Sequence, residues 1–204
     1  MEEIEKYTKL WDLPQGYGNN YDHPYWVEIA TTLKHEMGLT GIHQCHKILD
    51  VGGGDQRLAK FFTEHSYASL DIAPNAMGPG ENAYPHTVTD ISQYRGHANE
   101  FHWVISIDVM EHIPTDLIDD AIANIWNTVT EGAAFLISTR PDRGGKKIGA
   151  ILHMTVREPK WWVEKMGQYW SKVSLVRVVS GEYCLLVCRH SKSCSEKTQS
   201  ESKT

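Results

Sequence analysis

The sequence predicts a three-layer α/β sandwich, built on a mostly parallel sheet that ends in an antiparallel hairpin. Two observations support this fold class. Over residues 47–139, short apolar runs alternate with segments of helical periodicity, and such alternation implies crossover units with parallel strands. Further along, residues 173–179 and 183–189 have strand-like composition and are separated only by residues 180–182. So short a link joins strands only as an antiparallel hairpin.

The individual strands and helices are predicted from apolar periodicity and from residues typical of helix starts. Five strands are expected in the parallel part, at residues 47–51, 67–72, 87–91, 101–107 and 133–139, where apolar, β-branched or aromatic residues cluster. Helical segments are expected at residues 24–37, 56–65, 116–129 and 159–166. Pro114 stands just before the third helix and Pro159 opens the fourth, as is typical of helix starts. With the hairpin, the predicted sheet has seven strands.

Size and charge indicate an ordinary globular protein. The chain has 204 residues, which suits one domain with a sizeable core. It carries 26 acidic against 20 basic residues, a formal charge of −6, which argues against broad electrostatic capture of nucleic acid or of an anionic membrane. No apolar run approaches the roughly 20 residues that span a bilayer, and the first residues, MEEIEKYTKL, lack an apolar signal core. A cytoplasmic location is therefore expected.

Three parts are expected along the chain. Residues 1–45 should form an N-terminal lid and helix, because an aromatic and polar stretch at residues 17–25 precedes the first helical pattern. Residues 46–190 should form the core. Residues 191–204 contain no aliphatic or aromatic side chain and are expected to be disordered.

The cysteines predict neither a disulfide nor a metal site. Cys184 and Cys188 are four residues apart on a predicted strand, about 13 Å from each other, which is too far for a disulfide or a shared ion. Cys45 lies in the run 43–46, HQCH. No second ligand pair with the spacing of a zinc site appears elsewhere, so we expect this run to be a polar connector and the protein to need no metal.

A glycine turn and a later acid form the most informative motif. Gly52, Gly53 and Gly54 follow the first strand and precede a predicted helix, so the backbone can turn tightly and approach a ligand closely. Asp71 ends the second strand, about twenty residues later, where an acid overlooks the crevice at the carboxyl ends of the strands. A tight strand–helix turn and a solvated acid are the structural alternatives. The pairing of the two features favours a site for a nucleoside.

Other nucleotide sites fit less well. A dinucleotide fingerprint requires a third spaced glycine under the pyrophosphate, and Arg57 occupies that place. A P-loop is also missing, since no Gly-Lys-Ser/Thr follows the glycines. A nicotinamide-dependent dehydrogenase is therefore disfavoured.

Four segments together resemble the class I S-adenosylmethionine-dependent methyltransferases, a Rossmann-like family. Residues 48–55 resemble the first motif of that family, and residues 68–72 resemble the second, with its ribose-binding acid. Residues 89–91 resemble the third motif, which contacts adenine, and residues 103–114 resemble the fourth strand and the turn after it. The resemblance covers about residues 47–189 and includes the final hairpin.

The resemblance implies the cofactor S-adenosylmethionine and in-line methyl transfer to a small-molecule acceptor, with a general base where the acceptor is a hydroxyl. His112 and His153 are the catalytic candidates, and Glu111 is a further candidate base. A structural role remains open for each histidine, and Asp50 has the alternative role of a buried acid that caps the glycine loop. The residues implied in cofactor binding are Asp50, Gly52, Gly53, Gly54, Asp71, Ile72, Asp90, Ile91, Asp108 and Val109.

Some positions depart from the family pattern or leave a choice open. Gln56 stands where the family often has glycine, so its side chain either narrows the methionine end of the pocket or forms hydrogen bonds there. The basic run 140–147 either recognises an anionic acceptor or is a solvated loop. The motifs of the DNA-base methyltransferases are missing after the fourth strand, so no nucleic-acid partner is expected. The alternative function is a non-catalytic module that binds a cofactor or a partner.

Overall fold

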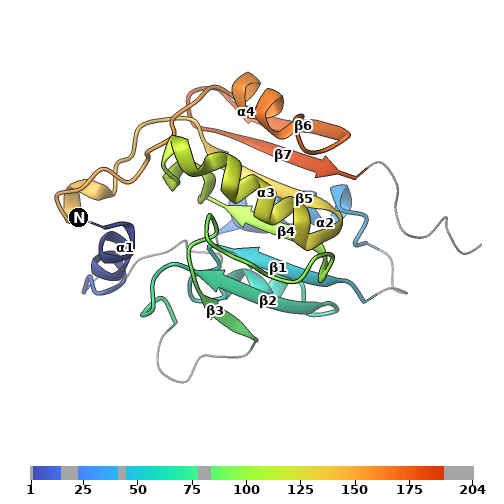
Figure 1. Cartoon of the computed structure of the whole chain (residues 1–204), viewed down its shortest axis with the longest axis horizontal. Helices are drawn as coiled ribbons and strands as arrows, with labels where there is room; N and C mark the ends of the chain where they lie inside the picture. Colours follow the sequence, from blue (N-terminus) through green and yellow to red (C-terminus); the bar gives the residue numbers. More distant parts are fainter. Residues whose placement is uncertain (1, 15–22, 41–44, 78–83, 191–204) are drawn as a thin grey trace, which may run out of the picture.

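The computed structural model describes residues 2–14, 23–40, 45–77 and 84–190. A single seven-stranded sheet has the order β3-β2-β1-β4-β5-β7-β6 (Figure 1). The strands from β3 to β5 in this order pair in parallel, whereas β7 runs antiparallel to both of its neighbours. The predicted fold class is thereby confirmed. The strands are β1 (Lys47–Val51), β2 (Ser66–Asp71), β3 (His86–Val88), β4 (Phe101–Ile107), β5 (Val129–Ser138), β6 (Lys172–Val179) and β7 (Tyr183–Arg189).

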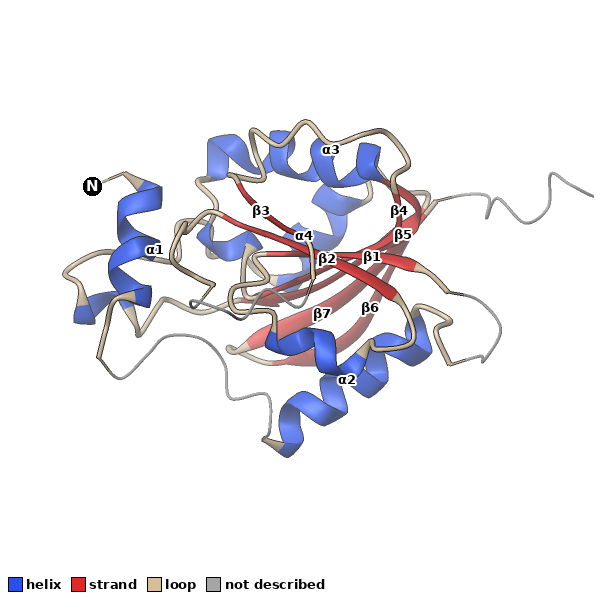
Figure 2. Ribbon diagram, turned by 90° about the horizontal axis from the view of Figure 1, so that it is seen from below, coloured by secondary structure: helices blue, strands red, loops and turns tan. Residues whose placement is uncertain are grey.

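Helices cover both faces of the sheet (Figure 2). Side chains of β1 alternate between the two faces: Ile48 packs in the layer under α2, and Leu49 and Val51 pack in the layer under α3 and α4. None of the described helices has the length and apolar character needed to traverse a lipid bilayer. The α-helices are α1 (Glu3–Trp11), α2 (Pro24–Glu36), α3 (Ile118–Thr128) and α4 (Pro159–Met166), and the 3₁₀ helices are η1 (Arg57–Phe61), η2 (Met110–His112), η3 (Thr115–Leu117) and η4 (Gly145–Lys147).

Several elements differ from the sequence prediction. β5 begins at Val129, at the end of the helix expected over residues 116–129, and not at residue 133. The helix expected at residues 56–65 is the short 3₁₀ helix η1, because Gln56 before it has the left-handed φ of +62° and β2 already begins at Ser66. The third strand is β3 rather than residues 87–91, so that Asp90 and Ile91 lie in the loop after it. Most of the predicted lid, half of the run 43–46 and the whole tail 191–204 lie outside the described residues.

Helix α1 was not predicted. Figure 1 shows it beyond the carboxyl ends of the parallel strands. Asn75, in the loop after β2, ties it there: its side-chain amide donates to the Thr8 carbonyl at 2.9 Å and to the Asp12 carboxylate at 2.8 Å. The signal in the sequence is the helical spacing of Ile4, Tyr7 and Trp11.

Candidate functional site

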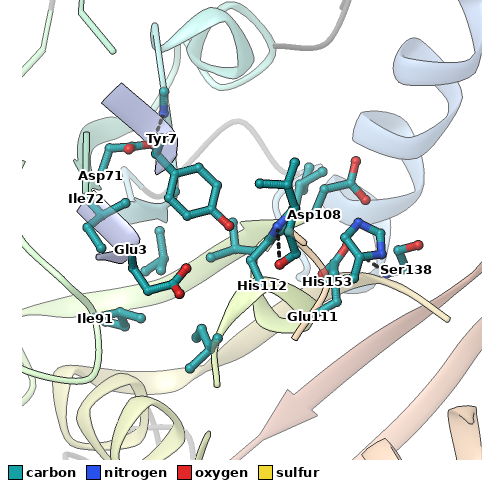
Figure 3. Close-up of a pocket in the computed structure, with 18 of the residues that line it drawn as sticks. Glu3, Tyr7, Asp71, Ile72, Ile91, Asp108, Glu111, His112, Ser138 and His153 are labelled. Carbon is teal, nitrogen blue, oxygen red and sulfur yellow. Dashed lines mark hydrogen bonds between the residues drawn. The ribbon is translucent and has the colours of Figure 1, made fainter. Parts of the chain in front are cut away.

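A cavity of about 320 Å³ opens at the carboxyl ends of the parallel strands. Loops after β1, β2, β3, β4 and β5 form it, and residues of α1 line it as well (Figure 3). This edge is where open α/β sheets bind their ligands. The predicted site residues that line the cavity are Gly52, Gly53, Gly54, Asp71, Ile72, Asp90, Ile91, Asp108, Val109, His112 and His153.

The glycine turn is packed so tightly that it has little room for side chains. Gly52 has a φ of +74°, and a Cβ atom there would lie 2.2 Å from Cγ2 of Val109. Gly54 has a φ of +49°, and its Cβ would lie 2.8 Å from Cζ2 of Trp11. Because positive φ is costly for residues with a Cβ, both backbone and packing require glycine at these two positions.

Asp71 connects the glycine turn to the next loop. Its Oδ2 accepts a hydrogen bond from the Gly54 N–H at 3.0 Å, and its Oδ1 accepts one from the Ala73 N–H at 2.8 Å. Burial raises the pKa of this carboxyl group, and the two backbone donors act in the opposite direction. Each oxygen has a second lone pair. The carboxylate is thereby held at the edge of the cavity with acceptor capacity left for a ligand.

Hydrogen bonds fix the loop after β3, which contains the third motif, residues 89–91. Asp90 Oδ1 accepts from the backbone N–H and from the hydroxyl of Ser92, each at 2.8 Å. The side-chain amide of Asn124, on α3, donates to the carbonyl of Ile91 at 2.9 Å. These bonds fix the loop after β3, so that Asp90 and the buried Ile91 form one wall of the cavity.

The turn after β4 also lines the cavity. Asp108 has a φ of +54°, a conformation that Asp tolerates better than most residues, and its N–H donates to the carbonyl of Leu136 at 2.9 Å. Val109 then packs over Gly52.

Asp50 is the one predicted site residue that does not line the cavity. It is 3% exposed and lies beneath the glycine turn, where it accepts a hydrogen bond from the Tyr67 hydroxyl. Burial raises the pKa of Asp50 to about 7, and the nearby Asp71 and Asp55 also raise it, whereas the Tyr67 hydrogen bond lowers it. The approach of Asp50 to a cofactor stays a prediction. Of its alternative role as a buried acid that caps the glycine loop, the structure shows the burial, with the Tyr67 hydroxyl as the hydrogen-bond donor.

Gln56 takes neither of the two roles considered from the sequence. Its side-chain amide donates to the Ser69 hydroxyl at 2.9 Å and to the Tyr84 carbonyl at 3.0 Å. It is buried and does not line the cavity. The departure from glycine is therefore accommodated away from the site. Arg57 points outward as an ion pair with Asp55, at 2.6 Å.

Two histidines meet at the end of the cavity next to η2. The ring centroids of His112 and His153 are 4.8 Å apart, and Tyr7 reaches from α1 to within 5.6 Å of the His112 ring, centroid to centroid (Figure 3). Nδ1 of His112 lies 3.2 Å from the Leu152 carbonyl, and Nδ1 of His153 lies 2.7 Å from the Arg140 carbonyl. A carbonyl oxygen only accepts, so both rings carry their hydrogen on Nδ1.

The surroundings of His112 make it a weak base. Burial, followed by the effect of His153, lowers the pKa of His112 to about 3. The imidazole is therefore neutral at physiological pH. A general base works best with a pKa near the working pH. The environment of His112 therefore suits a neutral ring that makes a hydrogen bond or binds a cation better than a general base.

Glu111 lies beside this pair and is fully buried. Its Oε1 accepts a hydrogen bond from the Ser138 N–H at 3.0 Å, whereas Oε2 has no hydrogen-bond partner within the described part of the chain. Burial raises the pKa of Glu111 well above its usual range, and Asp108 adds to this effect. An orphaned buried oxygen of this kind calls for an explanation.

The basic run after β5 is ordered by acids. Arg140 and Arg143 both approach Glu182, at 2.7 Å and 3.4 Å, and Asp142 accepts from the N–H groups of Gly144 and Gly145. Arg140, Asp142 and Arg143 line the cavity. The run is therefore part of the site, and Glu182 pairs with two of its four cations.

Sequence reasoning missed the contribution of the N-terminal helix. Glu3, Tyr7 and Trp11 line the cavity from α1. The periodicity that marks the helix was present in the sequence, but no local pattern indicates which edge of the sheet a terminal helix will cover.

No protein-family model matches the sequence, and a search of curated proteins also gave no match. Solved structures do match. The N-methyltransferase NodS from Bradyrhizobium japonicum WM9, in complex with S-adenosyl-L-homocysteine, superposes with a TM-score of 0.66 at 15% identity, covering 94% of this chain and 100% of NodS. Magnesium protoporphyrin IX methyltransferase (ChlM) from Synechocystis PCC 6803, with bound S-adenosylmethionine, gives 0.61 at 14% identity, covering 94% and 98%. The DhpI complex with S-adenosylhomocysteine gives 0.63 at 14% identity, covering 83% and 88%.

These likenesses define the class of fold. The chain has the fold of the class I S-adenosylmethionine-dependent methyltransferases, as its four sequence motifs predicted.

Proposed function

We propose that the protein is an S-adenosylmethionine-dependent methyltransferase that acts on a small molecule. The observation that carries the proposal is the hydrogen bond between the Gly54 N–H and Asp71 at the edge of the cavity. It joins the glycine turn to the acid after β2, the two features from which the sequence predicted a nucleoside site. The fold, and the bound cofactors of the solved structures that share it, support the same conclusion.

The adenosyl group has a matching set of partners. Asp71 would accept hydrogen bonds from the ribose hydroxyls, as a fixed carboxylate with remaining lone pairs does readily. Asp90 and Ile91 would hold the adenine, and the turn Gly52–Gly54 would run along the methionine part. Asp108 and Val109 would separate the adenine from the acceptor. Asp50 contributes by supporting the turn from below.

The chemistry then depends mainly on alignment. S-adenosylmethionine bound in the cavity would supply its sulfonium methyl group to an acceptor lone pair as the carbon–sulfur bond breaks, and the proton of a hydroxyl or amine acceptor would pass to solvent. Holding the reactants in line and excluding water supplies much of the acceleration in such reactions. We assign His112 and His153 as catalytic residues that contact the acceptor, and Arg140 and Arg143 as the groups that would meet an anionic part of it.

Substituting Asp71 by Ala should weaken S-adenosylmethionine binding by about 1.5–3 kcal/mol, because hydrogen bonds to a charged group are lost. This corresponds to about 10-fold to 150-fold in the dissociation constant. Isothermal titration calorimetry measures the loss. Asp116→Ala, which removes an exposed acid on η3, is the control for the change in net charge.

Two results would contradict the proposal at different levels. Unchanged affinity in a folded Asp71→Ala protein would remove Asp71 from the site. No binding of S-adenosylmethionine or S-adenosylhomocysteine by the folded wild-type protein, at millimolar ligand, would reject the function. Release of S-adenosylhomocysteine with a library of small acceptors separates an enzyme from a module that only binds.

A further inference from the structure

Three side chains with metal-binding atoms converge at the acceptor end of the cavity. Glu111, His112 and His153 each offer one ligand atom, and these atoms all lie within 4.8 Å of one another. Glu111 and His112 belong to η2, after β4, whereas His153 comes from the loop after β5. Figure 3 shows the three together on one side of the cavity.

The two imidazoles are oriented as metal ligands usually are. Each donates its Nδ1 hydrogen to a backbone carbonyl, of Leu152 and of Arg140, so that the neutral form of each ring has its lone pair on Nε2. A histidine that binds a metal typically donates its other ring N–H to a carbonyl or a carboxylate, because that bond fixes the tautomer and the orientation of the ring.

The Glu111 carboxylate and the charges around it also favour a bound cation. Glu111 Oε2 is buried without a hydrogen-bond partner among the described residues, and leaving such an atom unpaired is costly. Asp108 and Asp142 line the same cavity. The nearby arginines, Arg140 and Arg143, share one acidic partner, Glu182. A bound cation would satisfy the orphaned oxygen and would lie among acids.

We propose that Glu111, His112 and His153 bind a divalent transition-metal ion. Two imidazoles and one carboxylate suit Zn²⁺, Fe²⁺, Co²⁺, Ni²⁺ or Mn²⁺, whereas Ca²⁺ and Mg²⁺ prefer oxygen ligands alone. The three ligand atoms, now within 4.8 Å of one another, would have to converge on one ion. Three protein ligands leave coordination positions open toward the cavity, as in catalytic metal sites.

This inference rests on the proposed function and makes its acceptor more specific. In a methyltransferase, the open positions would hold an acceptor with a metal-binding donor, such as a hydroxyl, a phenol or a carboxylate, next to the methyl group. His112 and His153 would then contact the acceptor through the ion. The sequence predicted no metal because the ligands come from two segments that only the fold brings together.

Cobalt binding tests the proposal directly. Co²⁺ is added to the full chain after treatment with a chelator and dialysis, and the visible absorption of coordinated Co²⁺ is recorded together with calorimetric titration of Zn²⁺. We expect one ion per chain. His153→Asn should weaken binding by more than about 10-fold, since even outer partners of metal ligands contribute 10-fold to 100-fold. His35→Asn, a change at an exposed histidine of α2, should leave it unchanged.

A Glu111→Gln variant and a measurement of S-adenosylmethionine binding distinguish loss of the metal site from loss of the fold. Glu111→Gln keeps an oxygen that can accept from the Ser138 N–H, and it should lose metal affinity while it retains S-adenosylmethionine binding in the presence of chelator. A folded wild-type protein that binds S-adenosylmethionine but takes up neither ion would overturn the metal site and leave the proposed function intact. Equal metal affinity in wild type, His153→Asn and Glu111→Gln would also overturn it.

Discussion

A Gly52→Ala variant should lose about 3 kcal/mol of unfolding free energy and most of its affinity for S-adenosylmethionine. The φ of +74° at Gly52 costs about 1–2 kcal/mol for a residue with a Cβ. The new methyl group would also lie 2.2 Å from Cγ2 of Val109, and overpacking of this kind costs about 1–3 kcal/mol. Urea unfolding measures the stability, and calorimetry measures the affinity. Because the turn must shift to relieve the contact, the binding loss should be at least about 10-fold.

A second glycine with a similar φ separates the cost of the backbone conformation from the cost of the contact with Val109. Gly181, in the hairpin turn, has a φ of +71°, and no atom lies within 4 Å of the position that a Cβ would take there. Gly181→Ala should therefore show the backbone cost alone and bind S-adenosylmethionine normally. Adding Val109→Ala to Gly52→Ala should recover part of the lost stability, because the clashing methyl groups are removed. Equal destabilisation by Gly52→Ala and Gly181→Ala would show that contact with Val109 is unimportant.

An Asp50→Asn variant should become more stable than wild type as the pH rises. The ordinary pKa of Asp, 3.8, describes the unfolded chain, and burial raises the pKa in the folded protein to about 7. The folded state therefore holds the proton more tightly, so wild-type stability is lost progressively as the pH rises between these two values and then stays constant. Asparagine does not titrate and can still accept from the Tyr67 hydroxyl. Between about pH 5 and pH 7, the stability difference in favour of the Asp50→Asn variant should grow by about 2 kcal/mol.

Urea unfolding at a series of pH values checks this prediction, with Asp116→Asn on the surface as the control for one lost charge. A stability difference that does not change with pH would show that Asp50 titrates normally. Affinity for S-adenosylmethionine should be unchanged in Asp50→Asn, because Asp50 does not line the cavity. A large loss of affinity would restore the role in cofactor binding that the sequence motif implied.

Local patterns predicted most of the sheet and one side of the site. The hairpin β6–β7 followed from a three-residue link, and α4 was predicted with its observed bounds because Pro159 marks its start. The glycines and Asp71 were found because they follow directly after strands, and the ends of parallel strands meet at one edge. These features depend on residues that are close in sequence, where conformational preference and periodicity act directly.

Residue order was therefore sufficient to predict the fold class, the glycine turn and the acid Asp71 at the edge of the cavity. Three other features became visible only in the folded chain: α1 covers this edge, Asp50 lies beneath the turn, and His153 meets Glu111 and His112. These arrangements depend on packing and burial between distant segments. Periodicity can indicate which face of an element is apolar, but the partner of that face is fixed only when the whole chain has folded.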